Sequence, residues 1–477
     1  MRSRFKIPPT CDREALLRSA VRVSQIFKSF LSQHREPRLQ AAWTALQGGL
    51  FLFPWMPTLG SVGLVLAVAG AWKQEYRTII RRPLNWGLAI LSGWLVITCC
   101  FAHNRPEAFL GLANLLPYFL VFAAYSSLIQ YPSQLRQLAK LLVIGSLPVV
   151  IIGFGQLFGG WAGNVPWQIV FGWILEAKGN PPGRMSSVFM YANILAAYLQ
   201  IMFILGLGLW IERFQAWRNS GNRYPVGQLL IWSVAVLGNA IALILTNSRN
   251  AWGIVVLACL SFALYLGWRW IVLGVTAAAS TVLWASFGPQ LGRQWLRSTI
   301  VPPFLWARLN DQLYPNRPLA LMRKTQWQFA WTMTQERPWM GWGLRNFTPL
   351  YQAKMHLWLG HPHNLLLMLM AETGIPATLL LCGLIGWVLA QAVLILRVWS
   401  DIEPLENRPS WHQDRLIFFT YLMAFGGCTL FNLVDVTLFD MRINTFGWVI
   451  LSAICGVVYR YQGILTSQRF EKAIDRD

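Results

Sequence analysis

Apolar runs long enough to cross a bilayer recur along this chain. A transmembrane helix needs about 20 consecutive, mostly apolar residues. Such runs are expected to form spans at about 84–102, 109–128, 138–158, 190–211, 226–246, 251–267, 270–287, 374–396, 415–433 and 443–459. A further apolar stretch, Ala41 to Trp72, is interrupted by Pro54 and Pro57, which predicts two short helices in a hairpin. The sequence therefore predicts an all-α polytopic membrane protein of about 12 transmembrane helices.

The composition supports a membrane protein and argues against a nucleic-acid-binding one. Only 12% of the residues are charged, against about 25% in soluble domains, and 55% are hydrophobic. The 40 Lys and Arg exceed the 19 Asp and Glu, which in a soluble chain would suggest nucleic acid. Here the basic residues lie between apolar runs, where cytoplasmic loops gather Lys and Arg. We therefore expect the lipid bilayer as a partner and no nucleic acid.

The distribution of basic residues predicts the orientation of the chain. With the N-terminus in the cytoplasm, 26 of the 40 Lys and Arg fall on the inner side, and nine of the 14 outer ones lie in one long loop. This asymmetry predicts that both termini are cytoplasmic, and the polar start of the chain predicts no cleavable signal peptide. The expected organisation is a basic cytoplasmic segment at 1–40, transmembrane helices 1–9 at 41–287, a long outer loop at 288–362, transmembrane helices 10–12 at 363–460, and a cytoplasmic tail at 461–477.

The long outer loop is too long to serve only as a connection. It has about 75 residues, well beyond the usual length of a connecting loop. It contains seven tryptophans, including Trp295 and Trp358, in an amphipathic arrangement. We therefore expect short helices in this loop that lie in the lipid headgroup layer. The same topology places residues 159–187, 247–250 and 435–442 on the outer side.

The strongest candidate for chemistry is His363, in the segment from Gly360 to Asn364. Histidine is the side chain best able to take a proton near neutral pH, and His363 lies at the outer mouth of a span. The alternative is an interfacial histidine solvated by headgroups. His361 and His363 flank Pro362 without a neighbouring carboxylate or cysteine, and the seven cysteines form no metal-binding pattern. We therefore expect no metal.

Several arginines are candidates for binding an anion. Arg249 lies in a polar break between two apolar helices, and Arg323 and Arg345 lie in the long loop among tryptophans and glycines. The planar guanidinium matches phosphate oxygens, although such arginines can also anchor a helix at the interface. Arg184 and Asn193 form a further polar pair, and Asn193 could equally be a helix-packing residue.

These segments together resemble the O-antigen ligase and polymerase superfamily. The resemblance rests on His363-Asn364 with Gly374 ten residues beyond the asparagine, on Ser248-Arg249, on Arg323-x3-Trp327, on Pro338-x2-Gly-x-Gly-x2-Asn-Phe347 and on Asn193-x2-Ala196, all in the same order. It covers about residues 180 to 460. Within the superfamily the segment from Asn247 to Gly253 is most similar to the cyanobacterial IctB-type proteins, which are named as inorganic-carbon (bicarbonate) transporters.

The resemblance implies a function and a set of site residues. It implies transfer of a polyprenyl-diphosphate-linked glycan to an acceptor hydroxyl at the outer face, without a cofactor. His363 would be the catalytic base, Arg249 and Arg323 would bind the diphosphate, and the supporting residues would be Arg184, Asn193, Asn364 and Arg345. The alternative is inorganic-carbon transport, with bicarbonate at the same arginines. Either implies an integral membrane protein of the cell inner (plasma) membrane or the thylakoid, and the oligomeric state stays open.

The predicted topology can be tested by labelling single introduced cysteines in intact cells. A cysteine introduced at Asn310 should react with an impermeant maleimide added from outside, because Asn310 lies in the predicted outer loop. A cysteine at Asn407 should not react until the membrane is permeabilised. Labelling of the second position but not the first in intact cells would invert the topology.

Overall fold

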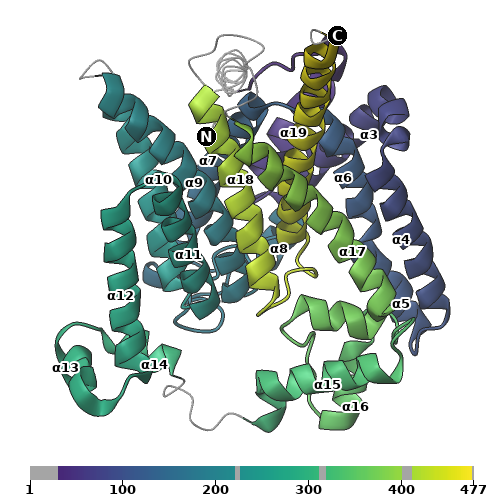
Figure 1. The fold of residues 1–477 in the computed structure, drawn as a ribbon. Coiled ribbons are helices and arrows are strands. Elements are labelled where there is room, and N and C mark those ends of the chain that lie inside the picture. Colours follow the sequence, from purple (N-terminus) through teal and green to yellow (C-terminus); the bar gives the residue numbers. More distant parts are fainter. Residues whose placement is uncertain (1–30, 221–225, 311–317, 400–410, 475–477) are drawn as a thin grey trace, which may run out of the picture.

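The chain folds into a bundle of helices (Figure 1). The computed structural model describes residues 31–220, 226–310, 318–399 and 411–474, and within these ranges every regular element is a helix. The α-helices are α2 (Gln40–Leu52), α3 (Pro57–Arg81), α4 (Pro83–Cys100), α5 (Arg105–Gly111), α6 (Leu116–Leu128), α7 (Pro132–Phe158), α8 (Val165–Phe171), α9 (Ala192–Ser220), α10 (Val226–Leu245), α11 (Arg249–Tyr265), α12 (Arg269–Phe287), α13 (Gln290–Thr299), α14 (Pro303–Leu309), α15 (Arg323–Glu336), α16 (Phe347–Met355), α17 (Leu365–Arg397), α18 (Trp411–Asn432) and α19 (Met441–Ile474). The 3₁₀ helices are η1 (Pro37–Leu39), η2 (Leu112–Asn114) and η3 (Leu319–Leu321).

The prediction of an all-α membrane protein is confirmed. Within the described ranges nine helices are long and apolar enough to cross a membrane: α4, α5 together with α6, α7, α9, α10, α12, α17, α18 and α19. The remaining three of the twelve expected spans are helices too. Of these, α11 has 17 residues, α2 has 13, and α3 carries charged residues in its second half. All twelve expected spans are therefore helical in the described ranges, and nine of them are both long and apolar enough to cross a membrane.

The helices differ sharply in how much of their surface other helices cover. In the most apolar stretch of α9 and of α19, 83% and 89% of the residues are buried, whereas the figure for α12 is 11%. α9 and α19 therefore lie at the centre of the bundle and α12 at its edge. A bilayer would supply the missing cover on α12, because lipid tails are as apolar as its side chains.

The predicted hairpin between residues 41 and 72 forms, but only its first helix, α2, is short, since α3 continues to Arg81. Glycines set the close packing of the two helices. α2 and α3 pack directly against each other across the turn at Pro54. A Cβ added to Gly63 would lie 2.8 Å from the Cα of Gly49 on the facing helix. Only glycine at this position lets the two backbones approach so closely.

The helices of the long loop gather at one end of the bundle. Figure 1 shows α13 to α16 at that end, while α19 ends at the opposite end. The expectation of short helices in the long loop is confirmed. The next span was expected to start near residue 374, but α17 begins already at Leu365 and continues through a kink at Gly374. Its first nine residues therefore extend the span toward the loop helices.

The Pro338–Phe347 motif packs along α17 at this kink. The N–H groups of Trp342 and Gly343 donate to the carbonyls of Ala371 and Glu372, at 3.0 and 2.8 Å. The N–H of Ile375 donates to the carbonyl of Pro338 at 2.8 Å. The sequence analysis selected Arg345 in this stretch as an anion-binding candidate, and in the structure most of the stretch holds the loop helices against α17.

Gly374 makes this contact possible. Its φ of +84° and ψ of 164° lie in a region that essentially only glycine occupies. A Cβ there would also lie 2.3 Å from the carbonyl oxygen of Trp339.

Replacing Gly374 should therefore destabilise the fold. We expect Gly374→Ala to cost about 2 kcal/mol or more, because both the backbone conformation and the loop contact are lost. Thermal unfolding of the purified protein in detergent measures the effect. The matched control is Gly383→Ala on the same helix, where an added Cβ meets nothing within 4 Å. Equal unfolding temperatures for the two variants would contradict the role given to Gly374.

Candidate functional site

A large cavity opens at the end of the bundle where the loop helices lie. Its volume is about 1020 Å³, and the predicted site residues Arg184, Asn193, Arg249, Arg323, Arg345 and His363 all line it. They come from segments spread over about 180 residues of the chain. The resemblance implied that Arg249 and His363 belong to one site, and both residues line this cavity.

Five helices begin at this cavity. The lining residues Asn193, Arg249, Arg323, His363 and Asp440 lie at or just before the first residues of α9, α11, α15, α17 and α19. The first N–H groups of a helix have no partner inside the helix, and the aligned peptide dipoles place partial positive charge at that end. The helix starts therefore add partial positive charge to that of the four lining arginines, against the lining carboxylates of Glu107, Asp435 and Asp440.

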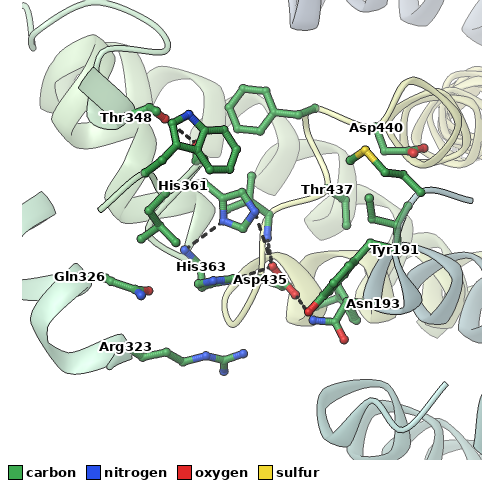
Figure 2. Close-up of a pocket in the computed structure, with 18 of the residues that line it drawn as sticks. Tyr191, Asn193, Arg323, Gln326, Thr348, His361, His363, Asp435, Thr437 and Asp440 are labelled. Atoms are coloured by element: carbon green, nitrogen blue, oxygen red, sulfur yellow. Dashed lines mark hydrogen bonds and ion pairs between the residues drawn. The ribbon is translucent and has the colours of Figure 1, made fainter. Parts of the chain in front are cut away.

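His363 is paired with a carboxylate that the sequence analysis did not select as a site residue. Its Nδ1 lies 2.9 Å from Oδ1 of Asp435, in the segment between α18 and α19 (Figure 2). Burial alone would raise the pKa of Asp435, but the hydrogen bond and charge of His363, the charge of His361 and the N–H of Val436 outweigh it and lower the pKa. An ionised carboxylate only accepts hydrogen bonds, so Nδ1 of His363 carries a proton, and in the neutral form of the ring Nε2 is the acceptor.

A chain of hydrogen bonds continues from Asp435 to an arginine. Asn193 donates from Nδ2 to Oδ2 of Asp435 at 3.0 Å, and its Oδ1 accepts from Arg184 at 2.6 Å. Arg184 also donates from Nε to the carbonyl of Thr246 at 2.7 Å. Asn193 therefore takes part in the site and does not serve helix packing alone. Its amide orientation is set by an acceptor on one side and a donor on the other.

His361 completes the cluster. The main-chain N–H of His363 donates to Nδ1 of His361 at 3.2 Å, and Nε2 of His361 lies 3.9 Å from Oδ1 of Asp435. Burial, and after it the charge of His363, lowers the pKa of His361 to about 4. His361 is therefore neutral near pH 7, with its proton on Nε2, because Nδ1 already accepts a hydrogen bond.

No carboxylate lies near His361 and His363 in the sequence, but the structure brings Asp435 next to them. The ligand atoms of His361, His363 and Asp435 lie within 4.8 Å of one another, close enough to hold an ion. A metal-bound histidine usually donates its other ring N–H to an acceptor. If Nε2 of His361 bound a metal, its Nδ1–H would face the N–H of His363, which is also a donor. The hydrogen bonds therefore favour a proton-transfer pair over a metal centre.

The arginines lie around this pair at different places. In Figure 2 Arg323 lies on one side of His363 and Asp435, and Asp440 lies on the other. Arg249 begins α11 and donates to the carbonyl of Leu309 at 3.2 Å, which ties α11 to the end of α14. Arg345 pairs with Glu107 of α5 at 2.9 Å, and both remain partly exposed to the cavity.

Asn364 has a structural part in the site. Its side chain accepts from the N–H of Leu367 at 3.0 Å and so caps the start of α17. It also donates to the carbonyl of Leu433 at 3.0 Å, two residues before Asp435. Asn364 therefore connects the segment that carries His363 to the segment that carries Asp435. The only sequence signal for Asp435 was its place in the predicted outer segment 435–442.

Taken together, the fold and the site define a polytopic membrane protein with a histidine–aspartate pair and several arginines in one cavity. Residues 234–382 match the family model described as O-Antigen ligase. The match supports the resemblance to the O-antigen ligase superfamily and, in general terms, ligase-like glycan transfer. It contains Arg249, Arg323 and His363 but ends before Asp435. A search of curated proteins finds no match to the chain.

The lowered pKa of His361 predicts a pH-dependent stability. The folded state binds the His361 proton only near pH 4, whereas an unfolded histidine binds it near 6.5, so acidification from 6.5 to 4 favours unfolding. Besides solvent, the group faces His363, Asp435 and Arg323. We expect the unfolding temperature to fall over this range and to fall less in His361→Asn, which has no group to titrate. His356→Asn, an exposed histidine outside the cavity, is the control. The same pH dependence in His361→Asn and the unaltered protein would contradict this prediction.

Proposed function

We propose that this protein transfers a polyprenyl-diphosphate-linked glycan to an acceptor hydroxyl at the outer face of the membrane, without a metal ion. The observation that carries the proposal is the hydrogen-bonded pair of His363 and Asp435 in the same cavity as Arg184, Arg249 and Arg323. A proton acceptor and several phosphate-binding groups are what such a transfer requires.

His363 acts as the general base. Its Nε2 takes the proton of the acceptor hydroxyl while the oxygen attacks the anomeric carbon of the glycan. Asp435 keeps the tautomer of His363 that leaves Nε2 as acceptor, and its negative charge stabilises the imidazolium that forms. A positioned base of this kind contributes about 10²- to 10⁴-fold to a rate.

The arginines act on the leaving group. As the new bond forms, the bond between the anomeric carbon and the phosphate oxygen breaks, and the lipid diphosphate leaves with the bonding electrons. Arg249 and Arg323, together with the helix starts beside them, stabilise that developing negative charge. Fixed positive groups in a partly enclosed cavity supply this stabilisation without reorganisation, so the reaction needs no metal.

The remaining part of the cavity suits sugar hydroxyls. Its lining includes Glu107, Arg345, Gln352 and Trp358, which offer hydrogen-bond donors and acceptors and an aromatic face. A volume of about 1020 Å³ exceeds what a diphosphate alone would occupy. We assign this part of the cavity to the glycan and the acceptor.

The alternative function is inorganic-carbon transport, which the resemblance to IctB-type proteins implies. Bicarbonate could bind the same arginines, and transport would then require passage through the bundle. The histidine–aspartate pair favours transfer, because binding of bicarbonate requires charge but no oriented base. The cyanobacterial type and the thylakoid or inner membrane as location remain predictions.

Two substitutions separate these functions. We expect His363→Ala to lower glycan transfer by about 10²-fold or more while the protein still folds. Arg249→Lys should lower it by about tenfold, because an ammonium keeps the charge but loses the paired N–H groups that match a diphosphate. Surface glycans of cells that carry each variant, and bicarbonate uptake by the purified protein in liposomes, are the measurements.

The control is His356→Ala, which removes an exposed histidine outside the cavity and should leave transfer unchanged. Normal surface glycans in both His363→Ala and Arg249→Lys, together with bicarbonate uptake that depends on the purified protein, would replace the transfer proposal by transport.

A further inference from the structure

The backbone of His363 has a conformation that few residues other than glycine adopt. Its φ is +53°, in the left-handed region, where a side chain crowds its own backbone. Such a conformation persists only where the surroundings hold it. The hydrogen bond that holds the main chain here is the one from the His363 N–H to Nδ1 of His361.

The ring of His361 is itself fixed from several sides. It meets the ring of His363 edge-on, with centroids 4.5 Å apart, and stacks on Phe439 with centroids 6.2 Å apart and an interplanar angle of 20°. The hydroxyl of Thr348 donates to the carbonyl of Gly360 at 3.0 Å, which anchors the segment just before His361 to α16. His361 is therefore a rigid acceptor, placed by contacts from two other parts of the chain.

The same ring also faces the carboxylate. With Nδ1 used as acceptor, Nε2 carries the proton and points its N–H toward Oδ1 of Asp435 across 3.9 Å. Oδ1 of Asp435 then has two imidazole N–H groups beside it, that of His363 at 2.9 Å and that of His361 at 3.9 Å. This arrangement favours the ionised carboxylate, which in turn keeps the proton of His363 on Nδ1.

We propose that His361 is a positioning residue for His363: its Nδ1 holds the main chain of His363 in the left-handed conformation and so directs Nε2 of His363 into the cavity. The proposal rests on the function proposed above for His363. His361 itself need not contact the substrate. Its essential atom is the acceptor at the Nδ1 position, and this requirement distinguishes it from a residue that only fills space.

Two variants isolate that atom. His361→Phe keeps a ring of similar shape for the contacts with Phe439 and His363 but removes the acceptor. His361→Asn loses the ring but places an amide oxygen close to the position of Nδ1, where it can accept the same N–H. A positioning role predicts that asparagine restores what phenylalanine loses, whereas a packing role predicts the reverse.

The readout is the rate at which diethylpyrocarbonate acylates His363 in the purified full-length protein at pH 7, located by mass spectrometry of peptides. In the unaltered protein His363 should react faster than His361, because the lone pair of His361 is already engaged. We expect His361→Phe to slow acylation of His363 by about threefold to tenfold, the equivalent of one lost hydrogen bond. Asp435→Asn should slow it similarly, and His361→Asn should restore the original rate. His356→Phe, which changes an exposed histidine that also has a positive φ of 53°, should leave it unchanged.

Thermal unfolding at pH 7 shows whether each variant folds. An unchanged rate in a folded His361→Phe, or an equal loss in His361→Asn, would overturn the proposal. Because acylation needs no glycan, the two proposals fail separately. If the acylation pattern is as expected but His363→Ala transfers glycan normally, the function assigned to His363 fails and the positioning role remains.

Discussion

Asp435 is a buried carboxylate, and a buried charge is stable only if several donors surround it. Its donors come from different parts of the chain: Nδ1 of His363 before α17, the amide of Asn193 at the start of α9, and its own neighbour, the N–H of Val436. Loss of any one of them would leave an ionised oxygen short of a partner inside the protein. The need to satisfy this one group therefore aligns three segments that are far apart in sequence.

The scaffold around the carboxylate also follows from the needs of polar groups. Inside a bilayer every backbone N–H and carbonyl must be paired within a helix, so unpaired groups occur at helix ends. Five helices begin at the same cavity, which the arginines also line. The kink at Gly374 and the loop that packs against it hold α15 and α16 over this end of the bundle. The packing of the loop against α17 thus also places Arg323, the first residue of α15, across the cavity from the starts of α9 and α19.

The helices and several residues of the site could be predicted from the sequence, but the partner of His363 could not. Hydrophobic periodicity and length predicted the helices, and residue chemistry singled out His363, Arg249 and Arg323. Asp435 was not selected, because it lies 72 residues from His363 and nothing local distinguishes it from a solvated acidic residue. Arg345 in the Pro338–Phe347 stretch was selected as an anion-binding candidate, but the glycines of that stretch serve close packing, Gly341 on α17 and Gly343 on Ala102. Sequence patterns show which residues are able to bind or react. A stretch that packs against a helix and a stretch that binds a ligand can have the same composition, so the pattern does not distinguish them.

The sequence by itself determined that the chain is an all-helical membrane protein, since repeated apolar runs of about 20 residues cross lipid as helices. It also showed which side chains are chemically able to transfer a proton or bind phosphate. Only the tertiary structure decided that these side chains share one cavity and that His363 has a carboxylate partner. It also decided that His361 accepts a hydrogen bond from the main chain of His363. The composition of a segment decides whether that segment forms a helix. The distance between the ends of two helices depends instead on how all the helices between them pack.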